Sequence, residues 1–329
     1  MGSEDTIGRV DRLLAERRFP DAARLLFAAA EAGESQAIAE LAHWRIVGNV
    51  IRRDLAEARR LLERAASKGE TEAALLHSSF LASGTGGAAD WAGALAELRA
   101  LAPDVPAAAA QLRLLDAMDL DDKGFPRAAM GRRELSAEPE AVAADAFLSE
   151  AECAYLRQAA EPALQPSVVV DPATGRMVPH PIRTSDGTMF GVHGEDLVVG
   201  AINRRIAALS DTRPEQGEPL QILRYRPGAQ YREHMDALPA EPNQRILTVL
   251  VYLSSDYEGG ETHFPRIGLT FRGEVGDALL FRNADAEGRP DPLALHAGLP
   301  VTRGVKYLAS RWIRAAPFHY PPPRPLLDL

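Results

Sequence analysis

The first hundred residues of the chain repeat with a period of 36 residues, and this repeat restricts what they can fold into. Small residues at fixed positions let helices approach closely, and a glycine after an apolar helical pattern favours a helix end. The repeat therefore predicts a stack of helix pairs. One copy carries Ala37, Gly48, Asp54, Ala56, Ala58, Leu62 and Ala66, and the next carries Ala73, Gly84, Asp90, Ala92, Ala94, Leu98 and Ala102.

About two and a half units of this pattern lie between Thr6 and Leu101, which is short for a stable stack. We therefore expect a capping helix from about Ala107 to Met118. The units resemble tetratricopeptide-like repeats of the Sel type. A stack of this kind can bind a protein partner or only support a neighbouring domain, and the sequence favours neither. His43 and His77 occupy near-equivalent repeat positions and are interpreted as packing residues.

Composition limits the class of protein. The chain has 329 residues, 46% of them hydrophobic, enough for two domains with ordinary cores. A net charge of −9 gives no general attraction to phosphate backbones, so we expect no nucleic-acid partner. No leader pattern and no apolar run of roughly 18 residues is present, so we expect a cytoplasmic protein without a membrane span. Cys153 is the single cysteine and is interpreted as a packed side chain.

The C-terminal half has the pattern of many short strands separated by glycine and proline, which predicts a jelly roll. Two helices precede or interrupt these strands: one over Phe147–Ala160, with Ser149 as its N-cap, and one over about Asp196–Ser210. The expected strands are Leu220–Tyr225, Arg245–Leu253, Leu269–Arg272, Ala278–Arg282 and Val305–Arg314.

These patterns divide the chain into a multidomain protein of α and β type. Residues 1–118 are expected to form the helical repeat domain, 119–139 a polar linker, 140–317 the strand-rich domain and 318–329 a proline-rich tail. Residues 171–187 combine prolines, glycines and Thr-Ser-Asp, and we expect a mobile loop there. The tail is interpreted as a disordered end, with docking on a partner as the alternative.

His234 and Asp236 follow a buried-strand pattern and a Pro-Gly break. In an extended chain, side chains two residues apart point the same way, so this pair could hold one metal ion together. A second histidine, His296, lies further along the chain. Two histidines and one carboxylate form the facial triad that holds non-heme Fe(II) and leaves coordination positions open.

At this point the sequence resembles the prolyl 4-hydroxylase-like branch of the Fe(II)/2-oxoglutarate dioxygenases. The resemblance covers about Glu140 to Pro317, and the ordered set of motifs is specific although each piece alone is not. The motifs are Phe147-Leu148-Ser149-Glu150, Arg183-Thr184-Ser185, Tyr225-x-x-Gly228-x-x-Tyr231-x-x-His234-x-Asp236, Gly259-Gly260-Glu261-Thr262, His296-x-Gly298-x-Pro300-Val301, and Lys306 with Trp312.

The resemblance implies a double-stranded β-helix with flanking helices and gives each site residue a role. It implies Fe(II), 2-oxoglutarate and O₂ as cofactors and co-substrates, with ascorbate as reductant. His234, Asp236 and His296 would bind the metal, and Lys306 with the Tyr225 hydroxyl would bind 2-oxoglutarate; the catalytic set is these three ligands with Lys306. The substrate side would contain Arg183, Ser185, Tyr231, Arg245 and Trp312.

His263 also follows the His-x-Asp pair and competes for the place of the second histidine. His296 is followed ten residues later by Lys306, the spacing the family shows, whereas the residue ten positions after His263 is Gly273. We therefore favour His296. Strand parity further predicts that Lys306, Ser310 and Trp312 share one face, where a buried lysine requires an anion.

The resemblance implies a hydroxylase that couples oxidative decarboxylation of 2-oxoglutarate to C–H hydroxylation, most simply of prolyl residues in a protein or peptide. Hydroxylation of another residue in a ribosomally made peptide, or of a free amino acid, is the alternative. From a different class, the repeats could act as an adaptor beside a barrel that senses oxygen or 2-oxoglutarate. The sequence does not specify the oligomeric state.

Overall fold

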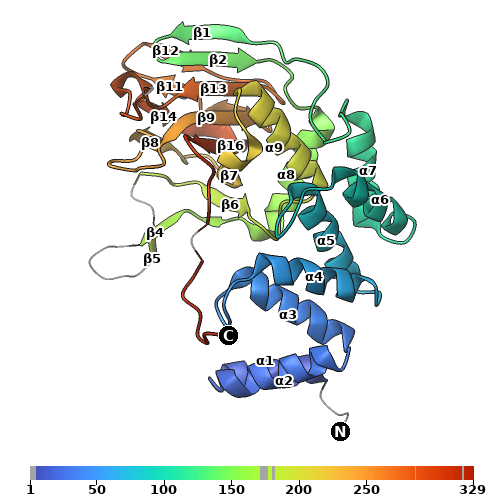
Figure 1. The fold of residues 1–329 in the computed structure, drawn as a ribbon. Coiled ribbons are helices and arrows are strands. Elements are labelled where there is room, and N and C mark those ends of the chain that lie inside the picture. The colour runs from blue at the N-terminus through green and yellow to red at the C-terminus, as the bar shows by residue number, and fades with distance from the viewer. Residues whose placement is uncertain (1–4, 171–176, 180–181, 286, 321) are drawn as a thin grey trace. The chain divides into compact units, whose positions relative to one another are not determined.

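The structure, a computed structural model, describes residues 5–170, 177–179, 182–285, 287–320 and 322–329. The chain divides into two compact units, which we name the helical unit and the strand-rich unit (Figure 1). The helical unit comprises Met1–Phe125, Val192–Ala201 and His319–Leu329, and the strand-rich unit comprises Pro126–Gly191 and Ile202–Phe318. The proline-rich tail, expected to be disordered, is thus part of the helical unit.

The helical unit contains the expected succession of short helices. Helix α3 begins at Ser35 and α5 at Thr71, 36 residues later, so the helices follow the period of the sequence. Among the helices that the structure describes, none has the length and apolarity to span a bilayer. The helices are α1 (Thr6–Ala15), α2 (Phe19–Glu31), α3 (Ser35–Val47), α4 (Leu55–Ala66), α5 (Thr71–Ser83), α6 (Trp91–Leu101) and α7 (Pro106–Ala117).

The recurring residues begin and end these helices. Gly48 and Gly84 end α3 and α5 in the left-handed conformation, each with φ of 76°, which an L side chain adopts only with strain. Asp54 and Asp90 cap α4 and α6 by accepting hydrogen bonds from backbone amides in the first turn. The expected capping helix is present as α7. Whether the helices are Sel-type repeats stays a prediction.

The strand-rich unit consists of antiparallel sheets. Its largest sheet has eight strands in the order β1-β2-β13-β9-β16-β7-β6-β3, and a second has four in the order β12-β11-β14-β8. Strands β10 and β15 pair with each other, as do β4 and β5. The strands are β1 (Arg133–Ala137), β2 (Glu140–Ala144), β3 (Gln165–Pro166), β4 (Val168–Val170), β5 (Met177–Pro179), β6 (Asp186–Phe190), β7 (Leu220–Tyr225), β8 (Tyr231–His234), β9 (Arg245–Tyr252), β10 (Tyr257–Gly259), β11 (Thr262–Phe264), β12 (Leu269–Phe271), β13 (Ala278–Arg282), β14 (His296–Gly298), β15 (Val301–Gly304) and β16 (Lys306–Arg314).

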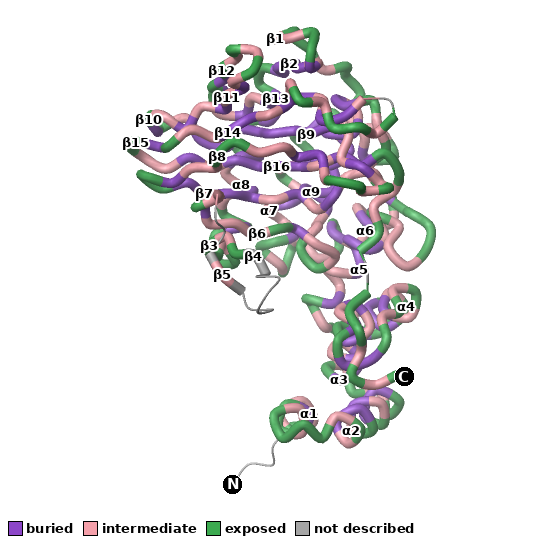
Figure 2. Tube along the Cα trace, turned by 90° about the vertical axis from the view of Figure 1, so that its left-hand side faces the viewer, coloured by how far each residue is buried: buried purple, intermediate pink, exposed green. Residues whose placement is uncertain are grey.

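The core of this unit lies between the eight-stranded and the four-stranded sheets. Aromatic side chains meet across it: Phe264 of β11 contacts Phe281 of β13 edge to face, with ring centroids 5.1 Å apart. Tyr252 of β9 contacts Phe271 of β12 in the same way at 5.6 Å. Such pairs add about 0.5–1.5 kcal/mol each beyond the burial of their area. The central strands β9 and β16 are almost entirely buried (Figure 2), so side chains on their inner face have fixed positions.

Helix α8 (Glu150–Ala160) packs against the eight-stranded sheet. The predicted N-cap, Ser149, is confirmed, and it forms a capping box: the Ser149 hydroxyl accepts from the Glu152 amide while the Glu152 carboxylate accepts from the Ser149 amide. Cys153 is fully buried on this helix, and burial raises the pKa of its thiol to about 12. A thiol of that kind is a packing residue rather than a nucleophile. The expected helix near residue 200 is α9 (Leu197–Leu209).

Two boundaries differ from the sequence-based expectation. The expected linker, 119–139, contains β1, which pairs with β2 at the edge of the large sheet. In the expected loop, 171–187, residues 171–176 and 180–181 lie outside the described residues, while Asp186 and Gly187 already belong to β6 and pair with β7. β6 depends on its distant partner β7, whereas β1 pairs with the adjacent β2 and joins the large sheet only because β2 pairs with the distant β13; local composition cannot show either distant pairing.

Candidate active site

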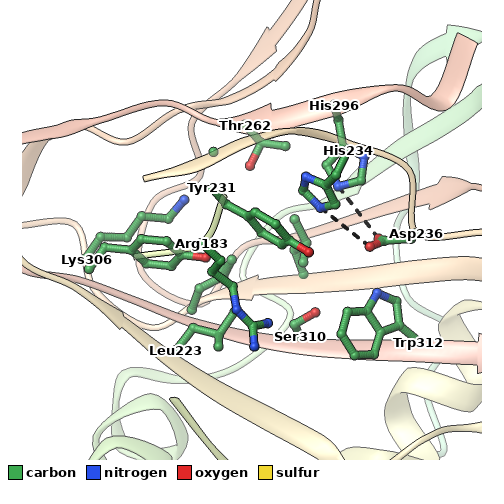
Figure 3. A pocket seen from close by; sticks show the side chains of 14 residues that line it. Arg183, Leu223, Tyr231, His234, Asp236, Thr262, His296, Lys306, Ser310 and Trp312 are labelled. Atoms are coloured by element: carbon green, nitrogen blue, oxygen red, sulfur yellow. Dashed lines mark ion pairs between the residues drawn. The ribbon is translucent and has the colours of Figure 1, made fainter. Parts of the chain in front are cut away.

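A pocket opens between the two main sheets of the strand-rich unit (Figure 3). Alternate residues of β16 supply one wall, because Lys306, Leu308, Ser310 and Trp312 lie on the same face of that strand. The predicted shared face of Lys306, Ser310 and Trp312 is therefore observed. The other lining residues are Arg183, Leu223, Tyr225, Tyr231, His234, Asp236, Leu250, Thr262, His296 and Gly298.

Three of the predicted residues converge at one place in this pocket. Strands β8 and β14 pair with His234 directly opposite His296, and Asp236 follows two residues after His234. The Nε2 atoms of both imidazoles lie 3.6 Å from the Asp236 carboxylate, each from a different oxygen. One ligand atom from each residue lies within 4.8 Å of the others. Ligands about 2.1 Å from one ion would lie at comparable separations.

Backbone carbonyls orient both imidazoles. His234 Nδ1 lies 2.8 Å from the Arg232 carbonyl oxygen, and His296 Nδ1 lies 3.0 Å from that of Ala294. Because a carbonyl only accepts, Nδ1 donates in both residues, and Nε2 is the ring nitrogen that faces Asp236. Burial also lowers the pKa of His296 to about 4, which keeps this ring neutral at pH 7. Neutral imidazoles with free Nε2 atoms are the form that binds a metal.

A chain of two hydrogen bonds orients the carboxylate. The Thr248 hydroxyl on β9 donates to Asp236 Oδ2 at 2.6 Å, and the Asn283 amide donates to the Thr248 hydroxyl at 2.8 Å. Burial opposes the charged form of Asp236, but His296, His234 and the Thr248 hydroxyl together hold the pKa of Asp236 well below its usual value. An ionised carboxylate together with two imidazole Nε2 atoms fits a divalent iron ion with open coordination positions.

His263 does not join this cluster. It lies on β11 next to Thr262, and because Thr262 faces the pocket, alternation along the strand directs His263 to the other side. Its Nδ1 is 2.9 Å from the Thr270 hydroxyl of β12. The geometry therefore favours the second histidine chosen from the sequence, His296.

The other end of the pocket contains a buried cation. Lys306 faces Tyr225 on the neighbouring strand, with its Nζ 5.5 Å from the centre of that ring, and donates to the Gly260 carbonyl oxygen at 2.7 Å. Burial lowers the pKa of Lys306 to about 7, and burial raises that of Tyr225 to about 12. A lysine whose ammonium form is destabilised by burial gains most from a bound carboxylate.

The residues predicted on the substrate side occupy two positions. Arg183, Tyr231 and Trp312 line the pocket; the Tyr231 ring stacks on His234 with centroids 3.5 Å apart. Arg245 does not line the pocket, but its guanidinium lies 3.6 Å from the centre of the Trp312 ring and pairs with Glu218. Ser185 is buried and hydrogen-bonds to Tyr225 outside the lining.

The sequence did not identify several residues of the site. Leu223, Leu250, Thr262 and Leu308 form its walls, and strand alternation from Tyr225 and Lys306 could have identified Leu223 and Leu308. Thr248 and Asn283 meet only because β9 pairs with β13. No signal in the sequence links those two residues to Asp236.

The fold and this cluster are typical of one class of protein, in which antiparallel sheets enclose two histidines and a carboxylate that face one metal position. Residues 220–314 match the family model of the 2OG-Fe(II) oxygenase superfamily. The chain is 40% identical over 200 residues to "Prolyl 4-hydroxylase 1" of Arabidopsis thaliana, covering 55% of this chain and 70% of that protein. It is 37% identical over 208 residues to "Probable prolyl 4-hydroxylase 3" of the same plant, covering 56% and 72%.

Among solved structures, the viral collagen prolyl hydroxylase of Paramecium Bursaria Chlorella virus-1, in its 2OG complex, is 31% identical with a TM-score of 0.44; the match covers 54% of this chain and 96% of that one. The chain belongs to the prolyl 4-hydroxylase family of Fe(II)- and 2-oxoglutarate-dependent oxygenases. The family recognised from the sequence motifs is confirmed. So are the enzyme class and its need for Fe(II), 2-oxoglutarate and O₂.

The Thr248 hydrogen bond gives a testable expectation. Thr248→Val keeps the shape of the side chain but removes the donor to Asp236, so metal affinity should fall about 10- to 100-fold. Calorimetric titration of the metal-free protein with Fe(II) or Co(II) measures this metal affinity. Thr270→Val, which removes the partner of His263, is the matched control and should leave the affinity unchanged. Equal affinities for both variants would contradict the role of Thr248.

Proposed function

We propose that this chain hydroxylates prolyl residues of a protein or peptide, with Fe(II) bound by His234, Asp236 and His296. The observation that carries the proposal is the convergence of these three side chains at one end of a pocket whose other end contains the buried cation Lys306. A ligand that chelates a metal and also ends in a carboxylate matches both ends, and 2-oxoglutarate has this form.

The cofactors supply the oxidising chemistry: 2-oxoglutarate loses CO₂ and becomes succinate, one oxygen atom of O₂ enters succinate and the other enters the substrate C–H bond. The residues of the protein position the co-substrate and the substrate. Lys306 and the Tyr225 hydroxyl bind the distal carboxylate of 2-oxoglutarate, and this bound charge restores the ammonium form of Lys306. Leu223, Leu250 and Leu308 exclude water around the chain of the co-substrate.

The substrate side of the pocket supports a prolyl substrate. Tyr231 and Trp312 present aromatic surfaces beside the metal ligands, and apolar rings of this kind suit the pyrrolidine ring. The Arg245 guanidinium packs on the Trp312 ring and is itself paired with Glu218, so these two residues fix the position of the ring. Trp312 Nε1 is buried and has no hydrogen-bond partner among the described residues, so it can donate to a backbone carbonyl of a bound peptide. The relatives named prolyl 4-hydroxylase support the same substrate.

Two earlier expectations remain part of this proposal: ascorbate as the reductant and the cytoplasm as the location. A protein partner on the helices and a purely supporting role for them both stay open. The sequence places Ser185 and Arg245 on the substrate side; because neither lines the pocket, we propose that they act indirectly, through Tyr225 and Trp312. Hydroxylation of another peptide residue or of a free amino acid, and an adaptor role, stay as alternatives that a direct assay separates from prolyl hydroxylation.

The direct assay is mass spectrometry of proline-containing peptides, and of proteins from the native host, after incubation with Fe(II), 2-oxoglutarate and O₂. The expected product carries one added oxygen on proline. His234→Ala, Asp236→Ala and His296→Ala should each abolish it without unfolding the protein, because they remove metal ligands and little apolar surface. His263→Ala is the control and should retain most activity. Succinate formation without oxygen on any peptide would contradict the prolyl substrate.

Removal of the buried cation should affect the co-substrate selectively. Lys306→Met deletes the charged partner of a desolvated carboxylate, which costs about 2–5 kcal/mol, or at least about 30-fold in affinity. Calorimetric titration of 2-oxoglutarate into the Mn(II)-loaded protein measures the loss, and metal affinity itself should not change. Arg303→Met removes an exposed cation from the same region of sequence and serves as control. An unchanged affinity in Lys306→Met would assign the carboxylate to another residue.

The pKa of Lys306 also predicts a pH dependence. Below pH about 7 the lysine of the ligand-free protein is an ammonium, so the affinity for 2-oxoglutarate should be constant there. Above that pH the ligand must bind together with a proton, and the Kd should rise up to about tenfold per pH unit. Titrations between pH 6 and 9 test this, with Lys306→Met as a control whose Kd stays flat. A flat profile in the parent protein would contradict the assignment.

A further inference from the structure

The end of the chain docks on the helical unit. We name residues 322–329 the tail segment and residues 48–54, between α3 and α4, the α3–α4 connection. In Figure 1 the end of the chain lies beside α3 and α4. Both regions belong to the helical unit, and the tail segment is therefore an ordered part of it.

The contact has the form of an added strand. The amide of Leu326 donates to the Asn49 carbonyl oxygen and the amide of Leu327 to that of Val50, both at 2.8 Å. Ile51 and Leu327 form a parallel bridge, and the Arg52 amide donates to the Leu329 carbonyl oxygen at 3.2 Å. Backbone hydrogen bonds of this kind bind an extended peptide without regard to most of its side chains.

One leucine side chain of the tail segment and one arginine of α3 add to the backbone pairing. Leu327 packs against the apolar core of the helical unit, while the neighbouring Leu326 points outward with 57% of its surface exposed. The Arg45 guanidinium donates to the Leu329 carbonyl oxygen at 2.9 Å. Beside this contact lies a groove of about 700 Å³, formed by α2 with Leu327, Asp328 and Leu329. The groove has room for further residues of a docked segment.

The next repeat lacks this docking site, although its connection has the same length. In the connection that follows α5, Gly86 and Gly87 occupy the positions that Val50 and Ile51 occupy in the α3–α4 connection. Val50 and Ile51 are buried, Ile51 completely. Two apolar side chains on a surface connection require a cover, and their presence in only one of two equivalent connections is explained by a bound segment.

We propose that the α3–α4 connection and α2 form a binding site for an extended, leucine-anchored peptide segment, which the tail segment occupies in this structure. A partner segment of the same chemistry, with leucine at the position of Leu327, competes with the tail segment for the site. Because the tail segment is tethered, its effective concentration suppresses binding in trans until it is displaced. The inference is independent of the catalytic assignment, since its readout is peptide binding.

The test uses the full chain and a labelled synthetic peptide. The probe is fluorescein-PPRPLLDL-amide, with the sequence of residues 322–329, and its Kd is measured by fluorescence polarisation. Leu327→Asp releases the tail segment, so it should bind the probe about tenfold or more tightly than the parent protein. Leu326→Asp introduces the same charge at the exposed neighbour and should bind like the parent. Arg45→Ala added to Leu327→Asp should weaken the probe again.

Two further measurements make the outcome decisive. A probe with aspartate at the position of Leu327, PPRPLDDL, should not bind to any variant. Hydrogen exchange at the amides of residues 326 and 327 should accelerate in Leu327→Asp and not in Leu326→Asp, with thermal melting confirming that both variants fold. The proposal is overturned if Leu327→Asp binds the probe no better than the parent, or if both aspartate variants bind it equally well. If Leu327→Asp fails to fold, Leu327→Ala gives the same comparison.

Discussion

The pairing of β8 with β14 is the interaction on which the site depends. Its register places His234 opposite His296, and the chain then needs only two more residues to bring Asp236 into the same cluster. A shift by one residue would turn one histidine to the other face of the sheet and destroy the cluster. Phe281 and Phe264 support this register because their rings contact His296 from the core.

The two charged groups in the interior of the pocket, Asp236 and Lys306, differ in how the protein itself satisfies them. Asp236 remains ionised because histidines and a threonine surround it, whereas Lys306 has only a backbone carbonyl as its hydrogen-bond acceptor among the described residues. The Asp236 carboxylate is therefore stabilised before any ligand binds, whereas the Lys306 ammonium is not. A carboxylate ligand thus completes an arrangement that the protein alone leaves costly, and the resulting affinity depends on the protonation of one lysine.

The helical unit is organised by its repeated helix ends. Helices α3 and α5 end at the recurring glycines Gly48 and Gly84, and α4 and α6 begin at the recurring aspartates Asp54 and Asp90, so the same short signals fix these two helix pairs. The tail segment pairs with the α3–α4 connection, which has the buried apolar residues Val50 and Ile51 where the equivalent connection after α5 has two glycines.

The sequence by itself determined the helix pairs, the strands β7, β9, β13 and β16 to within a residue or two, and the three residues that cluster in the pocket, His234, Asp236 and His296. These depend on local periodicity, on caps such as Ser149, and on motifs whose spacing matches strand geometry. Only the tertiary structure decided that β1 joins the large sheet, that Thr248 and Asn283 orient Asp236, and that the tail segment is docked. The reason is physical: each of these depends on a partner more than 30 residues away in the chain or on an edge left open by other strands, and no local pattern carries that information.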